Sequence, residues 1–423
     1  MKPKKEKKSS FNSVDEDILP IIFSYLHLFD LVRCSCVCKS WNVIISRSRL
    51  LHSLYLKQWA NEASNSSFDM GRPLNVIIED LAMQHHRSVL VQGSVYVDQW
   101  KGHTSGVGQC RMKMGLILTG VGDKVMRLWS SENYKCMEEY SLSGLTPLVD
   151  FDFDESKVVG LTGTRICIWR QHGKRSIFPS HEGTFTKGLC MRYSDPEAVV
   201  GCEDGTVRIF DMYSKTCSRI IRMHSSHATC LALGEDQLIL SGSAYGGVAV
   251  SGLVSDQRVA TLKCANLRGS GVKTLCYNAS SQLVTAGSMN GWAACWDLRT
   301  MELLWGARVS PNAIYSMQYL RTDKSTLVMG GVDGVVRILD QNTGEILTRC
   351  VMEPSKAEST SINSLYGLVE RKKVKRITDD ETIGDIPLTA RPPIKCLAVG
   401  MGKVVSTHNT KYIRMWKFNK CEN

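Results

Sequence analysis

The sequence has 423 residues, of which 43% are hydrophobic and 22% are charged. These proportions are ordinary for a globular chain, and they exclude collagen-like and disordered classes. The formal net charge is +11, but two short runs, residues 1–8 and 371–376, supply nine of these charges. The remainder is nearly neutral, so no basic face is predicted and we expect no nucleic-acid partner.

The chain also lacks the patterns of secreted, membrane and metal-binding proteins. The apolar stretch 18–29 is too short and too polar to cross a bilayer, and the amino terminus does not resemble a secretory signal. The sixteen cysteines show no regular pairing, and the spacing of Cys34, Cys36 and Cys38 does not suit a zinc site. We therefore expect free thiols, no metal, no cofactor, no membrane contact and a location in the cytoplasm or nucleus.

A basic tail, residues 1–12, precedes a segment with helical periodicity, residues 13–59. Ser13 and the acids after it resemble a helix start, and apolar residues follow at helical spacing. Pro20 is expected to kink or shorten this first helix. Two further helices are expected, one starting near Asp30 and one near Ser40.

The residue order in this segment resembles the F-box: VDEDILPIIFSYL, then a DL pair, then VCKSW. The resemblance implies a small helical unit that binds the Skp adaptor of Skp-cullin-F-box ubiquitin ligases, and through it a cullin. Val14 and Asp15 stand where the family usually has Leu and Pro. An alternative is a three-helix cap that only fills its own core. The resemblance assigns adaptor binding to Val14, Asp15, Ile18, Leu19, Ile22, Leu31, Val37, Cys38, Lys39 and Trp41.

Residues 60–92 are interpreted as a linker. Its first part is polar, and NVIIEDLAMQHHRSVL is compatible with one amphipathic helix that sets the distance between the docking unit and the rest of the chain.

From residue 110 onward, one sequence pattern recurs: small residues, a turn, alternating apolar residues and an aromatic residue or its substitute. The aligned positions lie roughly 40–45 residues apart, except for a longer last interval, a period typical of WD-repeat propellers. They are Trp129, Trp169, Phe210, Ser251, Trp296, Leu339 and Trp416. The chain therefore resembles the WD-repeat family, and we predict a mostly β fold, with a seven-bladed propeller over residues 93–423 and a small α-helical amino-terminal F-box.

Two features of the predicted propeller concern its outer strands. The seventh repeat ends after its third strand, and Ser94–Trp100 alternates apolar and polar residues, so we predict that this segment supplies the missing outer strand and closes the ring. The long last interval predicts an insertion over residues 353–391. Its run RKKVKR is interpreted either as a nuclear import signal or as an ordinary solvated loop.

In WD-repeat proteins a turn Asp, a loop His, a strand Ser or Thr and the Trp form one hydrogen-bonded set. The first repeat matches the whole set with His103, Thr119, Asp123 and Trp129. The resemblance gives these residues a structural role.

The combination of an F-box and a propeller resembles the substrate receptors of ubiquitin ligases, which bind a target protein without catalysing its modification. A non-degradative scaffold is the alternative. Catalytic motifs such as GxSxG, HExxH and the P-loop are absent from the sequence, so an enzyme is not expected. The target is unknown. Five residues are predicted to share one rim of the propeller and are candidates for target binding; they suit an acidic or phosphorylated segment of the target. They are Lys124, Lys187, Lys273, Tyr315 and Lys395.

Overall fold

A computed structural model describes residues 18–26, 28–59, 74–120, 124–142, 147–170, 175–177, 186–254, 257–353, 360–364, 367–378, 383–384 and 386–420. The chain divides into two compact units, residues 1–85 and 86–423. Among the described residues, no helix combines the length and hydropathy that crossing a membrane requires.

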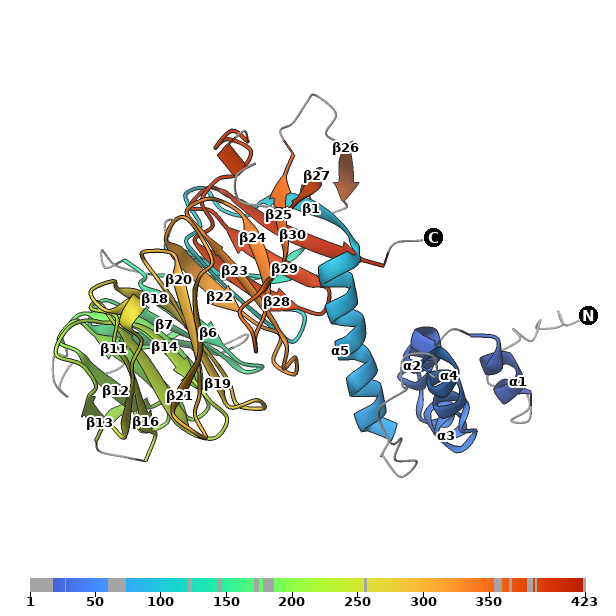
Figure 1. The fold of residues 1–423 in the computed structure, drawn as a ribbon, viewed down its shortest axis with the longest axis horizontal. Helices are drawn as coiled ribbons and strands as arrows, with labels where there is room; N and C mark the ends of the chain where they lie inside the picture. Colours follow the sequence, from blue (N-terminus) through green and yellow to red (C-terminus); the bar gives the residue numbers. More distant parts are fainter. Residues whose placement is uncertain are drawn as a thin grey trace, which may run out of the picture. The chain divides into compact units, whose positions relative to one another are not determined.

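The first unit consists of short helices around one apolar core (Figure 1). Pro20 lies in the first turn of its first helix, where its missing N–H costs no hydrogen bond, so it starts the helix rather than kinking it. Cys38 caps the third helix by accepting from the Trp41 amide at 3.5 Å. The helices are α1 (Leu19–Ser24), α2 (Leu28–Ser35), α3 (Lys39–Arg47) and α4 (Leu50–Trp59), followed by the start of α5 (Leu74–Gln92).

The second unit is a β-propeller, as predicted: five blades are antiparallel sheets of four strands, and the last two blades belong to one ten-stranded sheet. Blade one contains β2 (Gln109–Lys113), β3 (Leu116–Gly120), β4 (Val125–Ser130) and β5 (Cys136–Ser141). Blade two contains β6 (Asp150–Phe153), β7 (Lys157–Thr162), β8 (Arg165–Arg170) and β9 (Arg175–Ile177). Blade three contains β10 (Gly188–Ser194), β11 (Glu197–Cys202), β12 (Thr206–Asp211) and β13 (Thr216–Arg222).

The remaining blades have the same order from the inner to the outer strand. Blade four contains β14 (Ala228–Leu233), β15 (Leu238–Ser243), β16 (Val248–Gly252) and β17 (Ala260–Leu262). Blade five contains β18 (Val272–Asn278), β19 (Leu283–Ser288), β20 (Trp292–Asp297) and β21 (Glu302–Arg308). Blade six contains β22 (Ile314–Gln318), β23 (Thr326–Gly331), β24 (Val336–Asp340) and β25 (Ile346–Met352), and blade seven contains β28 (Cys396–Gly400), β29 (Lys403–Thr407) and β30 (Tyr412–Asn419).

The ring closes through the strand that precedes blade one. β1 (Ser94–Lys101) pairs antiparallel with β30 from Ser94 opposite Asn419 to Lys101 opposite Tyr412. It thereby supplies the outer strand of blade seven, which confirms the predicted closure. The inner strands β28 and β2 are also in contact, so the ring is continuous from blade seven to blade one.

The predicted insertion contains a strand that the sequence interpretation missed. β27 (Gly367–Ile377) pairs with β1 on one side, and with β25 and β26 (Thr360–Ser364) on the other, so blades six and seven share one sheet. The run RKKVKR forms the second half of β27. The interpretation of this run as a solvated loop is therefore wrong, and an import receptor would meet it as part of a sheet.

Apolar side chains from neighbouring blades fill the spaces between the sheets. The end of α5 joins one of these cores, since Val89 and Leu90 are buried with residues of blades six and seven. Arg376 of β27 donates to a carbonyl in the last turn of α5, Val91 O at 2.6 Å, and to the carbonyl just after the helix, Gly93 O at 2.7 Å. Residues 86–92 are thus part of the propeller unit, whereas they were interpreted as linker.

Candidate functional site

The helical unit exposes apolar side chains that its own core does not use. Ile18 and Ile22, assigned to adaptor binding from the sequence, are about half exposed, and Val37 is 65% exposed. Cys38 and Lys39 are exposed beside Val37, and Trp41 is half-buried against Phe23, with ring centroids 5.2 Å apart. Ile18, Ile22 and Val37 are thus apolar side chains that stay exposed in the described helical unit, and such exposure is typical of a protein interface.

Two of the assigned residues occupy a different place. Leu19 and Leu31 are buried inside the helical unit, Leu31 with no exposed area. A partner cannot reach them in this conformation, so they support the surface rather than form it. Val14 and Asp15 lie outside the described residues.

Sequence reasoning missed three exposed apolar residues of the same unit. Tyr25 is 85% exposed, and Ile21 and Val43 are also exposed. Ile21 lies in the same run as Ile18 and Ile22, so its position next to them in the motif was a usable signal. Tyr25 directly follows α1 and lies in the same motif, so the same signal applied to it.

The predicted rim residues all belong to one side of the ring. Lys187 and Lys395 immediately precede inner strands, Lys273 and Tyr315 lie near the starts of two others, and Lys124 precedes β4, which runs parallel to β2. We call Lys187, Lys273, Tyr315 and Lys395 the lysine rim. Its three lysines are exposed. Lys395 Nζ lies 4.2 Å from the centre of the Tyr315 ring, a direct contact within the rim.

The structural set of blade one is assembled around Thr119. Its hydroxyl lies 2.8 Å from His103 Nε2 and accepts from Trp129 Nε1 at 2.8 Å. Asp123 lies outside the described residues. Blade seven contains a comparable arrangement that was missed, because His408 follows Ser406 by only two residues: Ser406 Oγ lies 2.8 Å from His408 Nε2 and accepts from Trp416 Nε1 at 2.9 Å.

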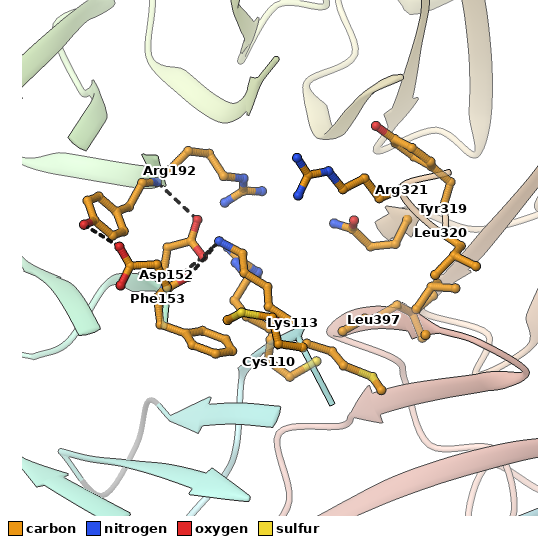
Figure 2. Close-up of a pocket in the computed structure, with 18 of the residues that line it drawn as sticks. Cys110, Lys113, Asp152, Phe153, Arg192, Tyr319, Leu320, Arg321 and Leu397 are labelled. Atoms are coloured by element: carbon orange, nitrogen blue, oxygen red, sulfur yellow. Dashed lines mark hydrogen bonds and ion pairs between the residues drawn. The ribbon is translucent and has the colours of Figure 1, made fainter. Parts of the chain in front are cut away.

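A cavity of about 1070 Å³ opens at the other end of the inner strands (Figure 2). All seven inner strands contribute lining residues, and the turns that follow β2, β6, β10, β22 and β28 contribute others. We call it the channel cavity. The lysine rim lies at the starts of the same strands, so the two features occupy opposite ends of the ring.

Buried carboxylates of blade two organise the cations of the channel cavity. Asp152 accepts from Lys113 Nζ at 2.6 Å and from the Tyr193 amide at 3.1 Å. Asp150 accepts from Arg111 Nη2 at 2.9 Å and lies 3.5 Å from Arg192 Nη1. Burial alone raises the pKa of Asp152, but Lys113 and the two arginines outweigh it and the pKa lies below its usual range. Both aspartates thus fix their cationic neighbours in place.

A protonated phenol also lines the channel cavity. Burial, and then hydrogen bonds to Asp154 and Asp195, raise the pKa of Tyr193 above its usual value, so the phenol stays protonated. Among the described residues, no group of three or more His, Cys, Asp or Glu side chains is arranged to hold a metal ion. Cations, phenols and thioethers around an open space suit a polar ligand with apolar parts.

Comparisons with known proteins found relatives for both units. Residues 16–57 match the model of the F-box-like family. The whole chain is similar to an F-box/WD-40 repeat-containing protein of Arabidopsis thaliana, with 50% identity over 99% of this chain and 97% of the relative. A WD repeat-containing protein 26 homolog of the same plant is 19% identical over 52% of this chain and 38% of its own length.

Among solved structures, the chain is similar to a computationally designed protein, Ika8. The TM-score is 0.55 with 20% identity, over 75% of this chain and 98% of the designed chain. At this identity the similarity concerns the fold alone, and it agrees with the propeller described above.

Proposed function

The chain belongs to the F-box/WD-40 repeat family, and we propose that it is the substrate-recognition subunit of a Skp-cullin-F-box ubiquitin ligase. An F-box generally binds the Skp adaptor, and the family consists generally of non-catalytic adaptors. The single observation that carries the proposal is the 50% identity to an F-box/WD-40 repeat-containing protein over 99% of this chain, which includes both units. In this role the helical unit holds the ligase, the propeller holds the target, and other subunits transfer ubiquitin.

The exposed apolar surface of the helical unit supports the adaptor half of the proposal. Ile18, Ile21 and Ile22 lie within one short stretch, and Val37 and Val43 flank the capped start of α3. Apolar side chains of this kind gain free energy when a partner removes them from water, about 25 cal/mol for each Å² covered. In the free helical unit these side chains stay in water and do not gain this free energy. We therefore infer that a partner covers them.

The lysine rim supports the target half. Three exposed lysines surround one side of the ring, and they suit an acidic or phosphorylated segment of a target through charge-assisted hydrogen bonds. The test converts Lys187, Lys273 and Lys395 together to Glu and measures target capture at low and moderate salt. We expect weaker capture by this variant, and weaker capture by the parent at higher salt. Equal capture by both proteins would place the target elsewhere.

The proposal as a whole is tested by purification of the tagged full chain from cells, followed by measurement of the half-lives of co-purified proteins. We expect the Skp adaptor and a cullin in the complex, and at least one co-purified protein whose half-life lengthens when the chain is depleted. Adaptor and cullin binding with unchanged half-lives of all co-purified proteins would favour the non-degradative scaffold.

A further inference from the structure

One cluster in the channel cavity places three cations around two buried carboxylates, while the rest of the lining carries charges of both signs. Arg111, Lys113 and Arg192 surround two buried acids, Asp150 and Asp152, with the pairings described above. One cation of this cluster is therefore in excess. A partly buried excess charge is costly unless an opposite charge approaches it, so the cluster favours an anionic ligand.

Arg192 has donors available for that ligand. Its interactions with described residues all use Nη1, which donates to Met191 O at 2.8 Å and lies 3.5 Å from Asp150 Oδ2. The guanidinium has five N–H donors in a planar fork, so Nε and Nη2 retain donors that no described residue accepts. The Nε atom of Arg111 is also buried without a hydrogen-bond partner among the described residues.

Arg321 approaches the same space from blade six. Figure 2 shows the guanidinium groups of Arg192 and Arg321 extending into the cavity from different walls. Arg321 pairs with Glu235 through Nε, but its side chain is 78% exposed, so water screens this pair and the guanidinium can turn toward a ligand. Two guanidinium groups directed into one space repel each other, and a carboxylate between them removes the repulsion.

The shape of the cavity selects the end of a chain. All seven inner strands contribute to it, so it opens at the centre of the ring, and turns of blades one and two extend its lining. One extended strand can enter such an opening with its end first, whereas an internal segment must enter as a doubled loop. Met112, Met114, Leu320 and Met401 line the walls, and flexible thioethers accommodate varied apolar side chains behind the terminal carboxylate.

We propose that the channel cavity binds the free carboxy terminus of a protein, with Arg192 and Arg321 as the carboxylate clamp and the apolar walls as the subsites for the preceding residues. This inference rests on the proposed function, since it names the class of target that the receptor would recognise. It adds a site at the opposite end of the ring from the lysine rim.

The test measures binding of fluorescein-labelled octapeptide pools to the full chain in complex with the Skp adaptor, by fluorescence anisotropy. The last four positions of the peptides are randomised, and the pool is prepared as free acids, as carboxy-terminal amides and as amides that contain one phosphoserine. We expect the free acids to bind at least tenfold more tightly than either amide pool. Equal binding of acids and plain amides, or tighter binding of the phosphoserine amides, would overturn the inference.

Variants localise the binding to the cavity. Arg321→Gln alters an exposed side chain and keeps the fold, and we expect it to weaken binding of the acids about tenfold; addition of Arg192→Gln should weaken it further. The matched control is Arg299→Gln, because Arg299 is also an exposed arginine paired with an acid, Asp297, but lies outside the cavity lining. Equal losses in the control and in Arg321→Gln would contradict the assignment. Co-purification of the adaptor and cullin is measured with the same protein preparations. If the peptides do not bind but the adaptor and cullin still co-purify, the inference fails and the proposed function stands.

Discussion

Asp98 of β1 and Arg371 of β27 form an ion pair across two strands that come from distant parts of the chain, with Arg371 Nε 2.9 Å from Asp98 Oδ1. Lys417 Nζ lies 3.1 Å from the same carboxylate, and Tyr134 Oη donates to it at 2.8 Å. Burial raises the pKa of Asp98, but these three partners outweigh burial and hold the pKa below its usual range. The carboxylate thus joins blade one, blade seven and β27.

Replacement of Asp98 should therefore weaken the closure of the ring. Asp98→Asn keeps the shape of the side chain but leaves Arg371 and Lys417 without their carboxylate; because both cations keep some contact with water, the cost should be about 2 kcal/mol, below that of a fully buried pair. We expect a loss of this order in the free energy of unfolding from chemical denaturation. The control Glu139→Gln breaks a pair whose acid is mostly exposed, and should cost less than about 1 kcal/mol. Equal losses in Asp98→Asn and Glu139→Gln would show that the Asp98 cluster stabilises the ring no more than an exposed ion pair does.

Truncations test the contribution of α5 and β1 to the propeller. The chain 86–423 retains every described contact of the second unit, and we expect its melting temperature to equal that of the propeller in the full chain. The chain 93–423 lacks Val89 and Leu90, so it should be less stable by several kcal/mol. The chain 102–423 also lacks β1 and exposes the edge of β30, so we expect aggregation. A soluble 102–423 with an unchanged melting temperature would contradict ring closure by β1.

The helical unit allows surface and core roles to be separated. Ile21→Glu and Val37→Glu change exposed side chains, so the helices should remain folded while binding to the Skp adaptor weakens at least tenfold. Leu31→Ala should instead destabilise the unit by about 2 to 5 kcal/mol, because it leaves a cavity in the core. The control is Ile220→Glu, an equally exposed apolar position of the propeller. Adaptor binding is measured by calorimetry and folding by circular dichroism. Wild-type affinity in both surface variants would show that the adaptor does not bind at these residues.

Buried histidines should make the propeller sensitive to mild acid. Burial lowers the pKa of His224 to about 4 and that of His408 well below its usual value. Between the unfolded pKa of about 6.5 and the folded pKa, the unfolded chain binds a proton that the folded chain does not, so stability falls as pH decreases through this window. For His224 the loss by pH 4 is on the order of 3 kcal/mol. Denaturation curves from pH 7 to pH 4 measure the slope, and His224→Asn should reduce it; an identical slope would argue against titration of His224.

The sequence predicted the parts of the fold that repeat. Each blade has the same alternation of a small-residue strand and a strand that ends near an aromatic residue or its substitute, and Trp129, Trp169, Trp296 and Trp416 mark four of the seven directly. Gly291 illustrates the local cause: its φ of +83° suits the turn between two strands, and a side chain there would meet the Ser310 carbonyl. Ring closure by β1 was predictable because a missing outer strand and an unassigned alternating segment occur in one chain.

β27 was not predictable from periodicity. The charged residues of β27 show little of the apolar-polar alternation that marks a strand. They face water or ion-pair partners at the outer edge of the ring, as Arg371 faces Asp98. The burial of Leu19 and Leu31 also escaped sequence reasoning, since core and interface residues of a small helical unit have the same apolar character. The channel cavity depends on residues such as Lys113, Arg192 and Arg321, which the ring closure brings together from blades far apart in the sequence.

The central claim, that one unit holds the ligase and the other holds the target, is tested most directly by affinity capture of the full chain and of a variant that lacks residues 1–59. Quantitative mass spectrometry compares the proteins bound to each. We predict that the variant loses the Skp adaptor and the cullin at least tenfold while it retains the other partners, and that the half-lives of those partners lengthen when the variant replaces the full chain. Retention of the adaptor by the variant, or loss of all partners together, would contradict the division of roles between the two units.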